Sequence, residues 1–258
     1  MELWTKEHAL QLIPCLLAML VICAVLRLAL GKKSLKIRMI PMQVIAVLIV
    51  LLEIGKQILS IKEQYVTGNW YSLPFHFCSL FIFTLPAMAF YRGKYRSQIC
   101  GVTAALCASL FLLMLIYPNL IYGSGSISSY FTNFMSLHTV TFHNLVMLAF
   151  LLFPALNLHE PQTKGDVKAS MLVILVFCIV SASMAHILKT NFANYYQCNI
   201  PILETLRLTI AGVAGAFPAK LLYIVIVSGL NFSFVYGAYW FYYLCNRILN
   251  RKKEKVSC

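Results

Sequence analysis

Charged side chains are scarce in this sequence. Only 11% of its 258 residues are charged and only eight are acidic, whereas 60% are hydrophobic. Soluble domains carry charge on about a quarter of their residues, so this composition excludes an ordinary soluble fold. No stretch between the apolar blocks is long enough to form a soluble domain, which leaves a nucleic-acid-binding function without a domain to carry it.

Paired cysteines are also missing. None of the nine cysteines has a partner at zinc-finger or thioredoxin spacing, and no haem-attachment motif occurs. Most of them lie within or at the ends of apolar segments, where a free cysteine acts as a small hydrophobic side chain. We expect no metal and no cofactor, although a haem between His76 and His143 or His186 remains an alternative.

Long apolar runs are what the chain has instead. Seven stretches approach or exceed the roughly 20 residues that a membrane-spanning helix needs, and they predict an all-α, polytopic helical bundle forming a single transmembrane domain over residues 1–258. The expected helices cover residues 9–30, 39–61, 73–90, 99–117, 134–156, 169–188 and 221–245. Residues 200–218 hold Glu204 and Arg207 between two prolines and predict a re-entrant or interfacial helix before the last span.

The basic residues indicate the orientation of these helices. Fourteen of the 21 lysines and arginines fall in the connections after the first, third and fifth helices and in the C-terminal tail. Because positive residues favour the cytoplasmic side, we expect an N-terminus that is outside or lumenal and a cytoplasmic C-terminus. The membrane is expected to be the bacterial plasma membrane or the endoplasmic reticulum.

Several polar residues fall inside or beside the expected spans. Ionisable groups are costly in a bilayer unless protein or trapped water receives them, so we expect these groups to surround a cavity near the outer face. Glu53 and Lys56 share one helical face and form either a neutralised pair between helices or a headgroup site. The further candidates are His76, Cys78, His138, His143, His186, Asn194 and Tyr195.

Cys78 has a distinctive place near the start of the third expected helix. Ser72 is expected to cap this helix and Pro74 to lie in its first turn, where no amide donor is lost. The amides of a first turn carry partial positive charge, which favours a thiolate at Cys78. His76 lies two residues away on the same helix and should face elsewhere, so the partner of Cys78 is expected from another helix.

Residues 73–78 read Leu-Pro-Phe-His-Phe-Cys and precede an apolar helix. This stretch resembles the Leu-Pro-x-His-x-Cys signature of the YwaF-like integral membrane protein family, the transmembrane protein 164 family. His143 in a mid-chain helix and the Asn194-Tyr195 pair after the penultimate helix are similar features. The resemblance implies acyl transfer between phospholipids, with Cys78 as the nucleophile and His143 as the base.

If the protein is such an acyltransferase, its expected partners are membrane phospholipids and lysophospholipids. The expected reaction passes the acyl chain through a thioester on Cys78, and water in place of a lysolipid would make the protein a lipid hydrolase. Substrate-binding roles are expected for Glu53, Lys56, His76, His138, His186, Asn194 and Tyr195. A non-catalytic lipid or solute transporter or receptor is the main alternative, and the sequence leaves the oligomeric state open.

Overall fold

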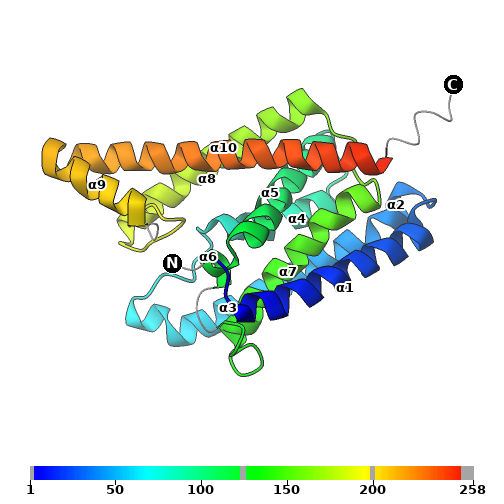
Figure 1. Cartoon of the computed structure of the whole chain (residues 1–258), viewed down its shortest axis with the longest axis horizontal. Coiled ribbons are helices and arrows are strands. Elements are labelled where there is room, and N and C mark those ends of the chain that lie inside the picture. Colours follow the sequence, from blue (N-terminus) through cyan, green and yellow to red (C-terminus); the bar gives the residue numbers. More distant parts are fainter. Residues whose placement is uncertain (1–2, 123–125, 198–200, 251–258) are drawn as a thin grey trace. The chain divides into compact units, whose positions relative to one another are not determined.

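The computed structural model describes residues 3–122, 126–197 and 201–250. Within these residues every regular element is a helix, which confirms the all-α prediction (Figure 1). The long helices are α1 (Lys6–Leu30), α3 (Ile40–Glu63), α5 (Arg96–Ile116), α7 (Phe134–Ala155), α8 (Thr163–Ile187) and α10 (Ala216–Asn250). The shorter ones are α2 (Leu35–Arg38), η1 (Tyr65–Thr67), η2 (Phe77–Ser79), α4 (Leu80–Phe90), α6 (Pro118–Tyr122) and α9 (Pro201–Ala214).

Six helices of the described chain are long and apolar enough to cross a membrane, and a seventh apolar helix, Phe77–Phe90, is shorter. The protein is therefore a multi-pass membrane protein. Its terminal basic residues Arg251, Lys252, Lys253 and Lys255, and also Cys198 and Cys258, lie outside the described residues.

The helices begin and end at different residues from those that hydropathy predicts. Helix α8 begins at Thr163 instead of residue 169, and α10 covers 216–250 instead of 221–245. An apolar run marks only the part of a helix inside the hydrocarbon core, which is about 30 Å thick, whereas the helix continues through the headgroup region. Lys164 and Lys168 are thus helical residues, although they were assigned to a connection.

The segment before the last span forms helix α9 and is separated from α10 by one residue. Gly215 has a φ of +89°, a left-handed conformation that glycine adopts without steric cost and that ends a helix. Its amide donates to the carbonyl of Ala211 at 3.1 Å. Within α9, Arg207 forms an ion pair with Glu204, which raises the pKa of the guanidinium. Interfacial placement of this helix stays a prediction.

The chain divides into two compact units, which we describe separately. Unit 1 contains residues 1–56, 81–170 and 235–258, and unit 2 contains residues 57–80 and 171–234. In unit 1, α5 is the central helix, since 72% of its most apolar stretch is buried and it packs against α7. The rings of Phe111 and Phe150 each stack on Phe241 in this core and pack against each other in a tilted arrangement, with centroids 4.7 Å apart.

Candidate functional site

Glu53 of α3 is the centre of a charged cluster in unit 1. Its side chain is only 9% exposed. The ammonium of Lys56 lies 2.7 Å from Glu53 Oε1, and Nε2 of His138 on α7 lies 3.3 Å from Oε2. Lys56 and Glu53 pair within α3 at i, i+3 spacing, whereas the contact between His138 and Glu53 joins α3 to α7. The structure thus brings together three of the predicted substrate-binding residues.

His143 lies in different surroundings on the same helix. It is buried, and its Nδ1 is 2.6 Å from the backbone carbonyl of Thr139. Because a carbonyl only accepts hydrogen bonds, Nδ1 carries the proton and, in the neutral ring, the lone pair lies on Nε2. The ring faces the edge of Tyr122, whose hydroxyl donates to Asn144 at 3.4 Å. This arrangement leaves the basic nitrogen of His143 on the side of the ring away from its own backbone.

The start of the helix that holds Cys78 differs from the prediction. Residues 73–76 are not helical, and the first helical turn is η2, with His76 as its N-cap in an extended conformation. Ser72 does not cap the helix, because the N-cap is His76, four residues later; the Ser72 hydroxyl donates to Gln64 Oε1 at 2.5 Å. The α conformation is disfavoured for the residue before a proline, here Leu73. The Phe75 carbonyl accepts from Ser181 of α8 at 2.8 Å, which holds the segment out of the helix.

His76 holds this extended segment in place. Its Nε2 donates to the carbonyl of Tyr71 at 2.9 Å, and its ring packs against those of Tyr71 and Phe192. The Nε2 proton of His76 is therefore directed at the backbone of its own loop. These contacts hold the loop that leads into Cys78, and a substrate-binding role for His76 stays a prediction.

Cys78 is a partly exposed cysteine in the first helical turn after this segment. The predicted start of this helix at Leu73 is wrong, because the first helical turn begins at Phe77, four residues later. Its neighbour Phe77 packs edge-on against Phe177 of α8, with centroids 5.9 Å apart. Partial burial and, to a smaller extent, the nearby Cys78 raise the pKa of Tyr71. Cys78 thus lies at the N-terminal end of a short apolar helix, with the positive ends of the peptide dipoles around it.

Asn194 and Tyr195 anchor the loop after α8 to α10. Asn194 has a left-handed backbone with a φ of +64°, and its carbonyl accepts from Tyr223 at 2.5 Å. Tyr195 is completely buried and shares a 3.0 Å hydrogen bond with Ser228, and Asn231 donates to its hydroxyl at 3.5 Å. These contacts support the loop, and direct contact with a substrate stays a prediction for both residues.

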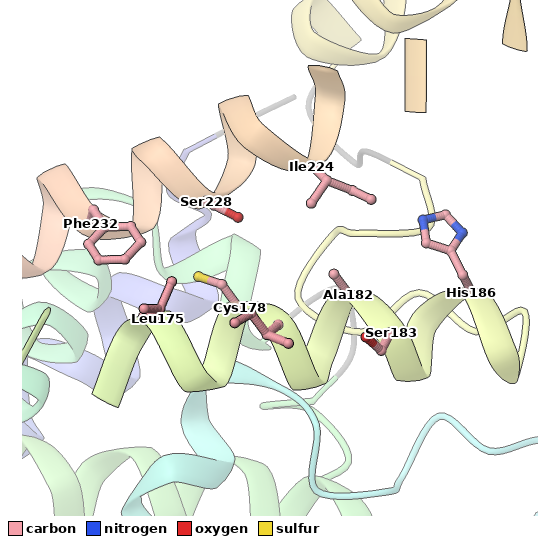
Figure 2. A pocket seen from close by; sticks show the side chains of 9 residues that line it. Leu175, Cys178, Ala182, Ser183, His186, Ile224, Ser228 and Phe232 are labelled. Carbon is pink, nitrogen blue, oxygen red and sulfur yellow. The ribbon is translucent and has the colours of Figure 1, made fainter. Parts of the chain in front are cut away.

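His186 borders a cavity in unit 2. The cavity has a volume of about 380 Å³ and is lined by one face of α8 and by the N-terminal half of α10. Figure 2 shows the His186 ring at one end of the cavity, across from Ile224. Nε2 of His186 is buried and meets no hydrogen-bond partner in the part of the chain that the structure describes.

The predicted site residues are divided between the two units. Glu53, Lys56, His138 and His143 belong to unit 1, and His76, Cys78, His186, Asn194 and Tyr195 belong to unit 2. The pairing of Cys78 with His143 therefore stays a prediction. Among residues 3–122, 126–197 and 201–250, no group of three or more His, Cys, Asp or Glu side chains forms a metal site.

The structure also contains a buried polar cluster that sequence reasoning missed. Asp166 in the first turn of α8 is fully buried, and its Oδ2 accepts from His159 Nε2 at 2.8 Å, the Gln162 amide at 2.7 Å and the Tyr239 hydroxyl at 3.1 Å. The Tyr242 hydroxyl donates to the His159 carbonyl at 3.2 Å. A lone acidic residue between Lys164 and Lys168 was the available signal, but hydropathy assigns this stretch to a solvated loop.

A comparison with known protein families identifies the family of this chain. The model of the TMEM164 family matches residues 3–249, which is nearly the whole chain. The chain belongs to the TMEM164 family. This match confirms the predicted transmembrane protein 164 family, whereas the YwaF-like label stays a prediction. Searches of curated proteins and of solved structures found no match for this TMEM164-family protein.

Proposed function

We propose that this TMEM164-family protein transfers acyl chains between phospholipids through a thioester on Cys78. The observation that carries the proposal is the position of Cys78: a partly exposed thiol in the first turn of an apolar helix, directly after the Leu-Pro-Phe-His-Phe segment. Phospholipid esters lie just below the headgroups, at the depth where membrane helices begin and end. A nucleophile at a helix start is therefore suitably placed to attack an ester without entering the bilayer centre.

In the first half-reaction His143 Nε2 removes the proton from the Cys78 thiol. The thiolate attacks the ester carbonyl carbon of a donor phospholipid, a C–S bond forms, and the ester C–O bond breaks. The lysophospholipid alkoxide leaves with the proton that His143 returns. The products are a lysophospholipid and an acyl thioester on Cys78.

In the second half-reaction the hydroxyl of an acceptor lysophospholipid gives its proton to His143 Nε2. The oxygen attacks the thioester carbon, the new C–O bond forms, and the C–S bond breaks. The proton on His143 then returns to the Cys78 sulfur. No oxidant, reductant or metal is needed, and the protein ends in its starting state.

The environments of the two residues support these roles. The hydrogen bond from His143 Nδ1 to the Thr139 carbonyl holds the neutral ring in the tautomer whose Nε2 accepts a proton. Lys56 offers a cation to the lipid phosphate, and Glu53 holds Lys56 at 2.7 Å. His76 fixes the loop that leads into Cys78. The mechanism requires Cys78 Sγ to come within reach of His143 Nε2, directly or through one water.

The test is acyl transfer by the purified full-length protein in lipid nanodiscs, with a donor phospholipid labelled in one acyl chain and an unlabelled lysophospholipid. We expect wild type to move the label to the acceptor and both Cys78→Ala and Cys78→Ser to abolish the transfer. Cys245→Ala is the matched control, because Cys245 is also a partly exposed cysteine. It should transfer the label at the wild-type rate.

A trapped intermediate would separate the proposed chemistry from simple lipid binding. Mass spectrometry of the wild-type protein after quenching should find the labelled acyl chain on the peptide that contains Cys78. If folded wild-type protein neither transfers label nor carries an acyl group on Cys78, the acyl-transfer proposal is wrong. A non-catalytic lipid transporter or receptor would then be the better interpretation.

A further inference from the structure

The cavity in unit 2 is an elongated groove between two antiparallel helices. Its α8 wall consists of residues at helical spacing, Leu175, Cys178, Ile179, Ala182, Ser183 and His186, and its α10 wall consists of Ile224, Ser228 and Phe232. In Figure 2, Phe232 lies across from Leu175 at one end and Ile224 lies near His186 at the other. The volume of about 380 Å³ is within the range of roughly 300–1,000 Å³ that is usual for ligand pockets.

The groove lies on a different face of α8 from the segment that contains Cys78. That segment contacts α8 through Phe177 and Ser181. With about 100° of rotation per residue, these positions lie roughly 150° around the helix from the groove-lining positions. The groove is therefore separate from the surroundings of the proposed nucleophile. A ligand bound in the groove would occupy a second site, distinct from the site of the proposed acyl transfer.

The walls of the groove are apolar and open to the surroundings. Leu175 is 45% exposed and Ile179 is 58% exposed, although both belong to a helix long enough to span a membrane. The central hydroxyl, on Ser228, is already hydrogen-bonded to Tyr195. The Ser228 hydroxyl therefore does not require a hydrogen bond from a ligand, and the apolar side chains around it suit a hydrocarbon chain.

One end of the groove is polar and cationic. His186 is the penultimate residue of α8, and its Nε2 is buried without a partner among the described residues. Lys220, in the second turn of α10, is exposed and lies one helical turn before the groove residue Ile224, on the same face of the helix. An imidazole N–H donor and an ammonium together are a suitable pair for a phosphate.

The distance between the apolar end and the polar end of the groove matches the length of a lipid acyl chain. From Leu175 to His186, α8 rises roughly 16 Å at 1.5 Å per residue, which is close to half of the hydrocarbon thickness of about 30 Å. The polar end coincides with the end of α8, where lipid headgroups lie, and the apolar end lies near the depth of a chain terminus. A phospholipid in one leaflet has the same order of groups along the same length.

We propose that the groove between α8 and α10 binds one acyl chain of a membrane phospholipid, with the phosphate of that lipid at His186 and Lys220. The lipid is held by this groove and is not the one that Cys78 attacks. A membrane phospholipid matches both the apolar walls and the cationic end, whereas a free fatty acid or a neutral lipid matches only part of the site.

The first experiment locates the chain. The full-length protein in nanodiscs is irradiated with a phosphatidylcholine that carries a diazirine near the end of one acyl chain, and labelled peptides are mapped by mass spectrometry. We expect label on residues 175–186 or 224–232, and a decrease of at least about ten-fold in Ala182→Trp, because the indole occupies the space of the chain. Val180→Trp, on the opposite face of α8 and 42% exposed, is the matched control and should keep the label.

Ile224→Trp blocks the groove from the α10 side and serves if Ala182→Trp does not fold. Unchanged labelling in a folded blocking variant, or label confined to other helices, would overturn the assignment of the groove. Cys78→Ala should be labelled like wild type. If the wild-type groove is labelled but no acyl transfer occurs, the lipid-binding groove is supported and the proposed acyl transfer is wrong. If acyl transfer occurs but the groove is not labelled, the acyl transfer is supported and the lipid-binding groove is wrong.

The second experiment tests the phosphate position. His186→Phe and Lys220→Gln are compared with wild type using the same photoactivatable chains in phosphatidylcholine and in diacylglycerol. We expect the apparent affinity for phosphatidylcholine to fall by about three- to five-fold in each variant, the size of one exposed charged contact, and the affinity for diacylglycerol to stay unchanged. Equal losses for both probes, or no loss for either, would contradict a phosphate at this end.

Discussion

The carboxyl group of Asp166 occupies the space that a side chain at Gly101 would need. A Cβ atom placed on Gly101 of α5 would overlap Cγ, Oδ1 and Cβ of Asp166 on α8. Both residues belong to unit 1, and α5 is its most buried helix. This close approach places the fully buried carboxyl between α5, the loop with His159, and Tyr239 of α10.

The first prediction concerns this approach. Gly101→Ala should destabilise the protein by about 1–3 kcal/mol, because the added methyl group displaces a buried carboxyl that is bonded to three donors. The measurement is the thermal unfolding midpoint in detergent. Gly237→Ala is the control, since nothing lies within 4 Å of a Cβ at Gly237, and it should be neutral or stabilising by up to about 1 kcal/mol through helix propensity. Equal midpoints for the two variants would contradict the close contact.

The second prediction compares two buried tyrosines of α10. Tyr239→Phe removes a hydrogen bond to the Asp166 carboxyl, and Tyr242→Phe removes one to the His159 backbone carbonyl. Bonds to charged groups contribute about 1.5–3 kcal/mol and neutral ones about 0.5–1.5 kcal/mol, so Tyr239→Phe should lower the unfolding midpoint more. If Tyr242→Phe is the more damaging change, Asp166 does not act as a carboxylate in this cluster.

The third prediction concerns the cluster around Glu53. Lys56→Met removes the cation that lies 2.7 Å from a buried carboxylate and should destabilise the protein by about 3–5 kcal/mol. The double variant Glu53→Gln, Lys56→Met removes both charges and should recover most of this loss. Thermal unfolding of the two single variants and the double variant completes the cycle. A double variant as unstable as Lys56→Met would show that packing, and not charge pairing, determines the stability here.

The fourth prediction tests the base. Asn at position 143 can still donate an N–H to the Thr139 carbonyl but has no equivalent of Nε2. His143→Asn should therefore fold normally and lower the acyl-transfer rate by about 10²- to 10⁴-fold, the usual effect of losing a general base. Rates are measured in nanodiscs alongside the unfolding midpoint. A folded variant that transfers acyl chains at the wild-type rate would exclude His143 as the base.

Hydropathy and motif reasoning predicted the class of fold and the family. Apolar blocks of sufficient length require membrane helices, since unpaired backbone groups are too costly in hydrocarbon. The same reasoning placed the start of the Cys78 helix too early, at Leu73, because it counted an apolar stretch as helical. Hydrogen bonds from Ser181 and to Tyr71 hold residues 73–76 extended, and neither bond is visible in the local sequence.

The buried cluster of Asp166 could not be found by local reasoning either. A carboxyl near two lysines reads as solvated surface, and its burial depends on a glycine 65 residues earlier and a tyrosine 73 residues later. The contact of His138 with Glu53 is likewise a long-range pairing, between α7 and α3. Helix packing determines which side chains from different helices meet. Such contacts produce neither a hydrophobic periodicity nor a sequence motif from which they could be predicted.

The amino-acid sequence by itself determined that this chain enters a membrane as helices and that it carries the Leu-Pro-Phe-His-Phe-Cys segment, because both depend on residues close together in the chain. Tertiary structure alone decided that Cys78 opens a helix, that His138 meets Glu53, and that His186 closes one end of a groove with α10. These features depend on which residues of distant helices come into contact, and that is decided when the helices pack.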